Sequence, residues 1–310
     1  MRTKRVVTVF SFIIAWLFFV TGTKILSDMN RRVTRSSEIQ EHEYKIDREN
    51  THEQISHRQS SLISEKPVNL LLLGLDDGGK RCDVVTLFNC NPTDGKINIL
   101  SIPRDTKVYR KGNEMRFNAL YGLGSEEQVI AEVSNMTGLT IDYYVTIDFA
   151  GFRKIIDTLE GVAIDVPIDM HYDDPLQNLH IHLSKGAQLL DGKKAEQYVR
   201  YRKGNNKMEG YNEGDIGRIK VQQDFIKAFI QQKFKLKYIA KADKIYNILK
   251  EHIKTNINIS DITKYVSIAT KLELDEVSAY SLPGEVEDVN WYLIFDKEKT
   301  KALINEHFFK

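Results

Sequence analysis

The sequence VNLLLLGL (68–75) is an uninterrupted apolar run that ends in a charged loop. Such a run is typical of a β-strand that is buried on both faces within an α/β sheet. The next two apolar segments, DVVTLFNC (83–90) and KINILSI (96–102), are separated by NPTDG. The Asp94-Gly95 pair in that spacer is typical of a tight hairpin turn. These three segments therefore predict strands of an α/β sheet.

Downstream of these segments, helical and strand patterns alternate. Ser125 and Gln128 form a capping-box pattern that predicts a helix through Met136, and Gly138 is typical of its end. Further strands are expected at 142–149, 162–168, 277–283 and 289–295, and further helices at 151–159, 191–200 and 215–233. The alternation predicts a sheet with helices on its faces.

The composition excludes several classes of protein. Of the 310 residues, 42% are hydrophobic and 28% are charged, which is ordinary globular usage and rules out wholesale disorder or a polytopic membrane protein. The 44 Lys and Arg residues nearly balance the 43 Asp and Glu residues, so the formal net charge is +1. Because a dedicated nucleic-acid-binding protein carries a basic surface that neutralises phosphates, we expect no nucleic-acid partner.

The amino-terminal segment predicts a membrane anchor. Residues 6–22 are apolar and follow a short basic tail, which is typical of a signal anchor, with a cleaved signal peptide as the alternative. Basic residues flank the span on both sides, so their count does not decide its orientation. We expect the amino terminus in the cytoplasm and the bulk of the chain outside. The predicted organisation is a cytoplasmic tail over 1–5, a transmembrane signal anchor over 6–24, a polar linker over 25–66 and a folded domain over 67–310.

The two cysteines, Cys82 and Cys90, are too few for a disulfide framework. If the stretch between them is extended, they lie about 26 Å apart, far beyond bridging distance. A neighbouring Arg81 would lower the pKa of a thiol at Cys82, so a catalytic cysteine is a minor alternative for this segment.

The loop GLDDGGKRCD (74–83) carries the first candidate chemistry. It nearly matches a phosphate-binding P-loop, but Arg81 stands where that motif needs a Ser or Thr hydroxyl for Mg²⁺. Asp76 follows one strand and Asp83 opens the next, so both carboxylates can meet at the edge of the sheet. Two carboxylates with open positions suit Mg²⁺ that is bound jointly with a substrate phosphate. A charged loop in solvent is the alternative.

Arginines in two later segments could bind phosphate. Arg104 and Asp105 follow a strand and a proline in SIPRDT (101–106), and a guanidinium there is a natural bidentate phosphate ligand. In YVRYRK (198–203), Arg200 and Arg202 are two residues apart. They can share a target only if the chain leaves the helix at that point.

The last predicted helix before residue 233 offers a third group. Asp215, Arg218 and Gln222 have the spacing i, i+3, i+7, which places them on one helical face. The free N–H groups of the first turn would favour an anion there. An ordinary face of ion pairs in solvent is the alternative.

A histidine-rich stretch could suggest zinc. It contains His171, Asp173, Asp174, His180 and His182, with an H-x-H pair at its end. No third and fourth ligand are fixed by spacing, so the sequence favours a surface strand with two histidines over a zinc site.

Taken in order, several motifs resemble the LytR-CpsA-Psr family of membrane-anchored cell-wall enzymes. The resemblance runs from about Asn69 to Lys233. The motifs are NLLLLGLD (69–76), RCD (81–83), SIPRDT (101–106), FNALYGLG (117–124), DYYVTIDFAGFRKIIDTLEGVAIDVP (142–167), LSKGAQLLDGKKAEQYVRYR (183–202) and GDIGRIKVQQ (214–223). The resemblance implies a three-layer α-β-α sandwich with a mixed central sheet. It also implies an extracytoplasmic catalytic domain that includes the carboxy-terminal part of the chain.

The family's activity is implied in the same way. Family members transfer a glycopolymer phosphate, such as teichoic acid or a capsular polymer, from a polyprenyl-pyrophosphate carrier to peptidoglycan. The matching residues imply Asp76 and Asp83 as ligands of Mg²⁺, with Mn²⁺ possible. They imply the following set on the pyrophosphate: Arg81, Arg104, Arg200, Arg202, Arg218 and Gln222. Asp215 would orient this set, the arginines at 104, 200, 202 and 218 would act in catalysis, and Asp105 is the candidate general base.

Two departures from the family pattern and two rival functions stay open. Ile216 and Val221 stand where the family usually has Phe and a second Arg. Because Val221 lies off the helical face of Asp215, Arg218 and Gln222, we expect weaker support of the site rather than loss of activity. The loop DDGG (76–79) after Leu75 is also unusual for the family. The first rival is hydrolysis alone, which would make the protein a polyprenyl-pyrophosphate phosphatase. The second is a non-catalytic, lipid-binding or regulatory envelope protein.

Overall fold

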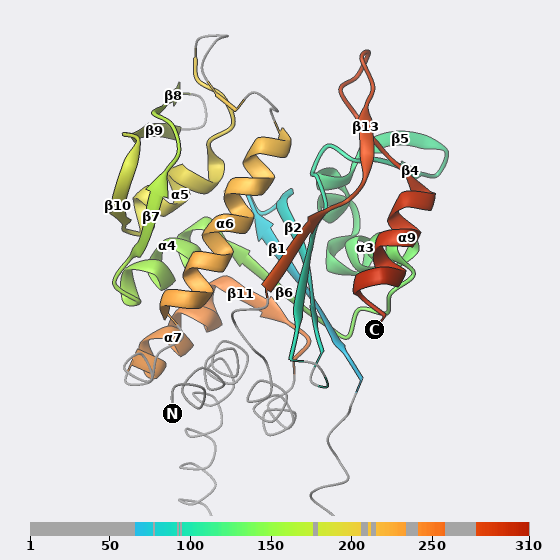
Figure 1. The fold of residues 1–310 in the computed structure, drawn as a ribbon, viewed down its shortest axis with the longest axis horizontal. Coiled ribbons are helices and arrows are strands. Elements are labelled where there is room, and N and C mark those ends of the chain that lie inside the picture. The colour runs from blue at the N-terminus through green and yellow to red at the C-terminus, as the bar shows by residue number, and fades with distance from the viewer. Residues whose placement is uncertain are drawn as a thin grey trace, which may run out of the picture.

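The computed structural model describes residues 66–76, 78–91, 93, 95–175, 179–205, 210–211, 215–233, 241–257 and 277–309. Its centre is a six-stranded sheet in the order β11-β6-β1-β2-β3-β12 (Figure 1). These strands are β1 (Val68–Leu75), β2 (Cys82–Cys90), β3 (Ile97–Ser101), β6 (Tyr143–Asp148), β11 (Ile253–Thr255) and β12 (Val277–Ser281). The predicted central strands are thus present, and β1 lies inside the sheet.

The sheet is mixed. β1 pairs antiparallel with β2, β2 pairs antiparallel with β3, and β11 pairs antiparallel with β6. β6 pairs parallel with β1, and β12 pairs parallel with β3. The predicted hairpin is confirmed as β2–β3, with Thr86 opposite Ser101 and Cys90 opposite Ile97.

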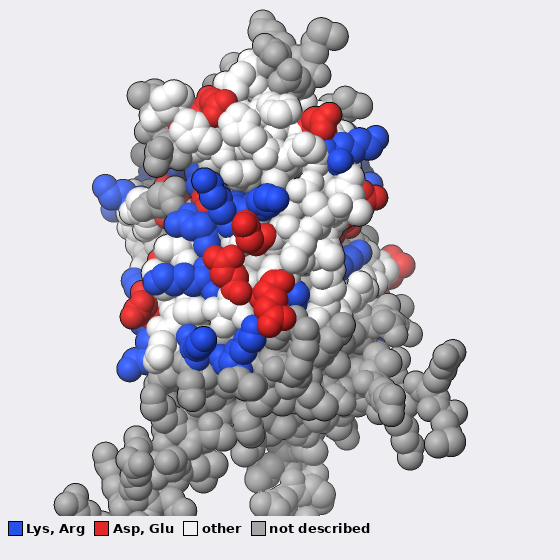
Figure 2. All heavy atoms as spheres, turned by 90° about the vertical axis from the view of Figure 1, so that its left-hand side faces the viewer, with Lys and Arg blue, Asp and Glu red and all other residues white. Residues whose placement is uncertain are grey.

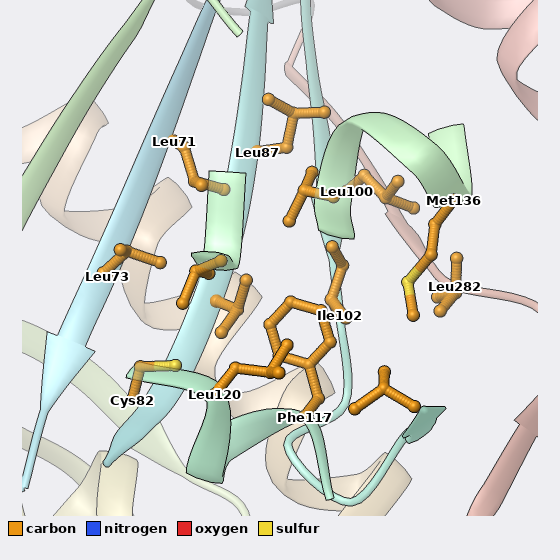
Figure 3. Close-up of a cluster of buried hydrophobic side chains, with 14 of the residues drawn as sticks. Leu71, Leu73, Cys82, Leu87, Leu100, Ile102, Phe117, Leu120, Met136 and Leu282 are labelled. Carbon is orange, nitrogen blue, oxygen red and sulfur yellow. The ribbon is translucent and has the colours of Figure 1, made fainter. Parts of the chain in front are cut away.

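Helices cover both faces of this sheet, which gives three layers (Figure 1). On one face lie α3 (Leu120–Thr137) and α9 (Lys297–His307), and on the other lies α6 (Asp215–Lys233). Alternate leucines of β1 point to opposite faces of the sheet. Leu71 and Leu73 lie in the core beneath α3 and α9, which Figure 3 shows. Leu70 and Leu72 pack in the core on the side of α6. The predicted strand buried on both faces is confirmed.

A third hydrophobic core lies beside the sheet. It is formed by α6 together with the following elements: α4 (Phe149–Thr158), β7 (Val162–Val166), β8 (Met170–Asp174), β9 (Leu179–Leu183), β10 (Gly186–Leu190) and α5 (Gly192–Arg200). Val221 and Phe225 bring α6 into this core, and Ile230 brings it into the core of the sheet. Helix α6 therefore packs in both the core of the sheet and the third core.

The remaining elements are short or peripheral. They are β4 (Lys107–Arg110), β5 (Asn113–Arg116), η1 (Phe117–Ala119), α7 (Ala242–His252), β13 (Gly284–Val286) and β14 (Leu293–Phe295). The hairpins β4–β5 and β13–β14 lie at the same end of the molecule as α9 (Figure 1).

Helix α3 departs from the predicted start. Gly124 and Ser125 have non-helical dihedrals, and Ser125 has a φ of 63°, so the helix kinks there. The Ser125 hydroxyl contacts Glu127, and the Gln128 side chain accepts from Arg110. The predicted capping box is therefore wrong, because both side chains have other partners. The predicted end is confirmed, since Gly138 closes the helix with a φ of 72°.

The end of α9 is buried in the sheet core. Phe308 is 1% exposed, and its carbonyl accepts a hydrogen bond of 3.2 Å from Nδ2 of Asn89 on β2. Nδ2 of Asn98 on β3 donates to the carbonyl of His307 at 2.6 Å. Two strands from the first third of the chain thus hold a segment that is about 200 residues distant in sequence.

Two further predictions concern the membrane span and the two cysteines. No helix among the described residues is long and apolar enough to cross a membrane, and the predicted span over 6–24 lies outside them. Cys82 and Cys90 are free, buried and at opposite ends of β2. Burial raises the pKa of each thiol to about 12, so the catalytic-cysteine alternative is wrong.

Candidate functional site

A cavity of about 230 Å³ lies between the central sheet and the third core. The loop after β3, the start of β2, the first residue of α4, the end of α5, the middle of α6 and the β8–β9 hairpin contribute to its wall. Its lining residues are Asp83, Val84, Arg104, Phe149, Tyr172, Leu179, Val199, Arg200, Arg202, Lys203, Arg218 and Gln222. Six of the predicted site residues therefore meet in one place.

Arg104 and Asp83 form the sheet side of the cavity. The Arg104 guanidinium lies 3.3 Å from Oδ2 of Asp83, and Asn118 donates to Oδ1 of the same carboxylate at 3.2 Å. On the other side, Asp105 lies 3.8 Å from Arg104 and 3.2 Å from Arg116. Arg104 is thus held between two carboxylates at the end of a stiff Pro-containing turn.

The end of α5 brings two arginines to the cavity. The helix ends at Arg200, and Tyr201 has the extended dihedrals −62° and 131°. The chain therefore leaves the helix between Arg200 and Arg202, as their shared target requires, and both side chains line the cavity. Arg200 also lies over the ring of Phe149, 4.5 Å from its centroid.

Glu196 holds Arg200 from within α5. Its Oε1 accepts from Arg200 at 2.6 Å, one helical turn away, and its Oε2 accepts from Arg153 of α4. Glu196 is only 8% exposed, and a carboxylate this buried needs such partners. The bond to Arg153 holds the Glu196 carboxylate in place, and the bond to Arg200 then fixes the direction of the Arg200 guanidinium.

Helix α6 supplies the far wall. Arg218 is 5% exposed and lines the cavity together with Gln222, whose Nε2 donates to the carbonyl of Val199 at 2.9 Å. Gln222 thereby ties α6 to the last turn of α5. Val221 is buried in the third core, off this face, as predicted. The backbone of α6 begins at Asp215, but its side chain lies outside the described residues.

Three predicted residues lie apart from the cavity lining. Oδ1 of Asp76 accepts from the backbone N–H groups of Lys80 and Arg81 at 2.9 and 3.1 Å, so this carboxylate closes its own turn. Arg81 is exposed on the same loop, and Asp105 is beside Arg104. The loop joins two antiparallel strands rather than a strand and a helix, which excludes the P-loop.

The structure also adds residues that sequence reasoning did not select. Glu196 could have been found from its i, i+4 spacing to Arg200, and Lys203 from its place beside Arg202. Phe149, Tyr172 and Leu179 carried no signal, because apolar residues in strand and helix patterns are usually core. Their role in the cavity depends on how distant elements pack.

The charge of the cavity points to an anionic ligand. Five of its lining residues are Arg or Lys, against the single carboxylate of Asp83. On the outer face that Figure 2 shows, by contrast, Lys and Arg side chains are interleaved with Asp and Glu. Converging guanidiniums bind phosphate oxygens in bidentate fashion and stabilise negative charge that develops on them. Fold and site together define an α/β protein with a cavity lined by four arginines and one lysine.

Comparison with known proteins identifies the family. The model of the LytR_cpsA_psr family matches residues 31–308. The chain therefore belongs to the LytR-CpsA-Psr family, which confirms the resemblance of its motifs.

Its relatives carry two kinds of name. The chain is 31% identical over 232 residues to the polyisoprenyl-teichoic acid–peptidoglycan teichoic acid transferase TagV of Bacillus subtilis, a match that covers 72% of this chain and 58% of TagV. It is 30% identical to the regulatory protein MsrR of Staphylococcus aureus, over 72% of this chain and 67% of MsrR. The crystal structure of B. subtilis TagV superposes with a TM-score of 0.62 at 28% identity, covering 79% of this chain and 98% of that one.

Proposed function

We propose that this protein is a membrane-anchored phosphotransferase that moves a glycopolymer phosphate from a polyprenyl-pyrophosphate carrier to peptidoglycan. The observation that carries the proposal is the convergence of Arg104, Arg200, Arg202 and Arg218 on one cavity from three separate segments. The name of TagV, a teichoic acid transferase acting on peptidoglycan, supports the same reaction class.

The proposed reaction follows from the charge of the cavity. An acceptor hydroxyl forms a bond to the phosphorus next to the glycan, and the bond from that phosphorus to the bridging oxygen breaks. Polyprenyl monophosphate leaves with the electron pair, and the arginines stabilise the charge that gathers on its oxygens. The proton of the hydroxyl passes to a base, for which Asp105 remains our candidate. Its contacts with Arg104 and Arg116 also keep Arg104 in place.

A divalent cation, Mg²⁺ with Mn²⁺ as an alternative, is part of this proposal. The carboxylate of Asp83 lines the cavity, and one carboxylate with substrate phosphates is a usual Mg²⁺ environment. Asp76 does not line the cavity, and its Oδ1 accepts two backbone hydrogen bonds, which leaves Oδ2 for a metal. Both oxygens of Asp83 have contacts, with Asn118 and Arg104, so Arg104 would share this carboxylate with the ion. When bound, the ion would neutralise charge on the pyrophosphate.

We further propose that residues 6–24 anchor the protein in the cell membrane as a single span, with the catalytic domain outside the cytoplasm. A polyprenyl carrier resides in the bilayer, and a linker over 25–66 would leave the cavity close to its surface. The apolar character of the segment supports this placement.

Mass spectrometry of the protein extracted from membranes, followed by a transfer assay, tests the proposal. A co-purified polyprenyl phosphate is expected, and its amount should fall in Arg218→Ala because that side chain lines the cavity. Product should form only when a peptidoglycan acceptor is present. Release of phosphate with water alone would instead favour the phosphatase. Absence of both lipid and turnover would contradict an enzyme and favour the regulatory function that the name of MsrR describes.

A further inference from the structure

The β8–β9 hairpin carries four side chains that can bind a metal, three histidines and one aspartate, on one face. In the register of the hairpin, His171 is opposite His182 and Asp173 is opposite His180. All four are exposed, whereas the alternate residues Met170 and Ile181 are buried in the third core. The strand period of two therefore places the four on the solvent side. Three of the eight histidines of the chain lie on this one hairpin.

Three of these side chains already point at one another. Nδ1 of His180 lies 2.6 Å from Oδ1 of Asp173, and Nε2 of His182 lies 3.1 Å from the same oxygen. The donor atoms of all three residues lie within 4.8 Å of one another. Two ligands of a tetrahedral zinc ion are about 3.3 Å apart, so small rotations would place these atoms around one ion.

Neighbouring groups hold the cluster in place. The backbone N–H of Asp173 donates to Oδ1 of Asn205 at 2.7 Å, and Nδ2 of Asn205 donates back to the carbonyl of Asp173 at 2.9 Å. The ring of His171 is 5.8 Å from that of His182, tilted against it. Fixed backbone around a ligand favours metal binding because less freedom is lost.

We infer that Asp173, His180 and His182 form a binding site for a divalent transition-metal ion, with zinc as its natural occupant. Two imidazoles and one carboxylate are a donor set that suits Zn²⁺ rather than Mg²⁺ or Ca²⁺, which prefer oxygen alone. The third ligand comes from the opposite strand. The spacing within the sequence did not reveal it. The predicted surface strands with histidines are present as β8 and β9, and the proposed metal site is built on them.

The position of the site suggests what the ion does. Tyr172 and Leu179, on the same hairpin, line the arginine-rich cavity. A metal that joins β8 to β9 on the outer face would hold this wall of the cavity in one shape. This inference does not rest on the reaction that takes place in the cavity.

Zinc titration of the full chain, stripped of metal with EDTA and followed with a competing chromophoric chelator, tests the inference. We expect about one bound Zn²⁺ per chain. His182→Ala and Asp173→Asn should each weaken binding by roughly tenfold or more. Asp174→Asn is the matched control, because it removes a carboxylate from the adjacent position of the same strand, outside the cluster, and it should bind Zn²⁺ like the unchanged chain.

Hydrogen exchange supplies a second readout. Zn²⁺ should slow amide exchange across 170–174 and 179–183 in the unchanged chain and in Asp174→Asn, and should have no such effect in His182→Ala. Thermal melting verifies that each variant is folded, and the exposed positions make loss of the fold unexpected. Lack of Zn²⁺ binding by the unchanged chain, or equal binding by all variants, would overturn the inference.

Discussion

Arg200 combines an ion pair with an aromatic contact in the wall of the cavity. Glu196 fixes its guanidinium from one side and the ring of Phe149 lies against its face. A lysine keeps the charge but not the planar, forked donor set, so it cannot keep both contacts and grip a phosphate. A lysine is therefore expected to replace Arg200 poorly, although it carries the same charge.

We expect Arg200→Lys to lower the transfer rate by at least about tenfold, which corresponds to roughly 1.4 kcal/mol of transition-state stabilisation. Steady-state transfer to a peptidoglycan acceptor measures the effect. Arg153→Lys is the control, since Arg153 binds the other oxygen of Glu196 but does not line the cavity. Equal losses in the two variants would mean that Glu196, rather than phosphate contact, explains the requirement.

The carboxylate of Asp83 gives a second test at this scale. Asp83→Asn keeps the size of the side chain but removes an anionic ligand, so the variant should still bind the lipid donor while transfer falls and the Mg²⁺ requirement rises. Transfer rate against Mg²⁺ concentration measures this, and thermal melting verifies the fold. Asp77→Asn, at a position outside the described residues, should be mild. An unchanged Mg²⁺ dependence in folded Asp83→Asn would contradict the metal assignment.

At the scale of single elements, strand β2 makes a chemical prediction. Cys82 and Cys90 are fully buried at its two ends, and burial raises the pKa of both thiols to about 12. Neither thiol should react with a disulfide reagent at pH 8 in the native protein, because the reactive thiolate is scarce and inaccessible. Both should react within minutes after denaturation in guanidinium. Rapid reaction of one thiol in the native state would show that β2 opens at that end.

The elements themselves were largely predictable from the sequence. Each predicted strand over 68–102 and each helix over 151–233 is present, because apolar runs and helical spacing reflect burial directly. The exit of the chain after Arg200 meets the condition that a shared target of Arg200 and Arg202 would impose. Ser125 was misjudged because its hydroxyl has a nearer partner in Glu127.

The site was predictable only where residues sit on regular elements. Arg218 and Gln222 share a helical face, and both line the cavity. Asp76 and Arg81 sit in a turn, where spacing does not tell whether a carboxylate faces outward or accepts from nearby backbone N–H groups. The cluster of Asp173 and the two histidines needed the cross-strand register, which only the fold supplies.

The whole molecule makes a prediction about topology. If residues 6–24 span the membrane with the amino terminus inside, then residues 67–310 face outward. Protease added to intact spheroplasts should then degrade the domain, and a cytoplasmic marker protein should remain intact as the control. Protection of the domain until the cells are lysed would contradict both the topology and the transferase proposal.

The burial of Phe308 against β2 has a consequence for how the protein is made. Leu71, Leu73 and Leu87 emerge early from the ribosome, but their cover includes Ile304 and Phe308, which are translated more than 200 residues later. Until that last helix is available, the part of this face that α3 does not cover stays apolar and open, and contacts so distant in sequence form slowly. The domain therefore completes its folding after its synthesis rather than during it, and a chain stalled before residue 300 is a substrate for chaperones and proteases.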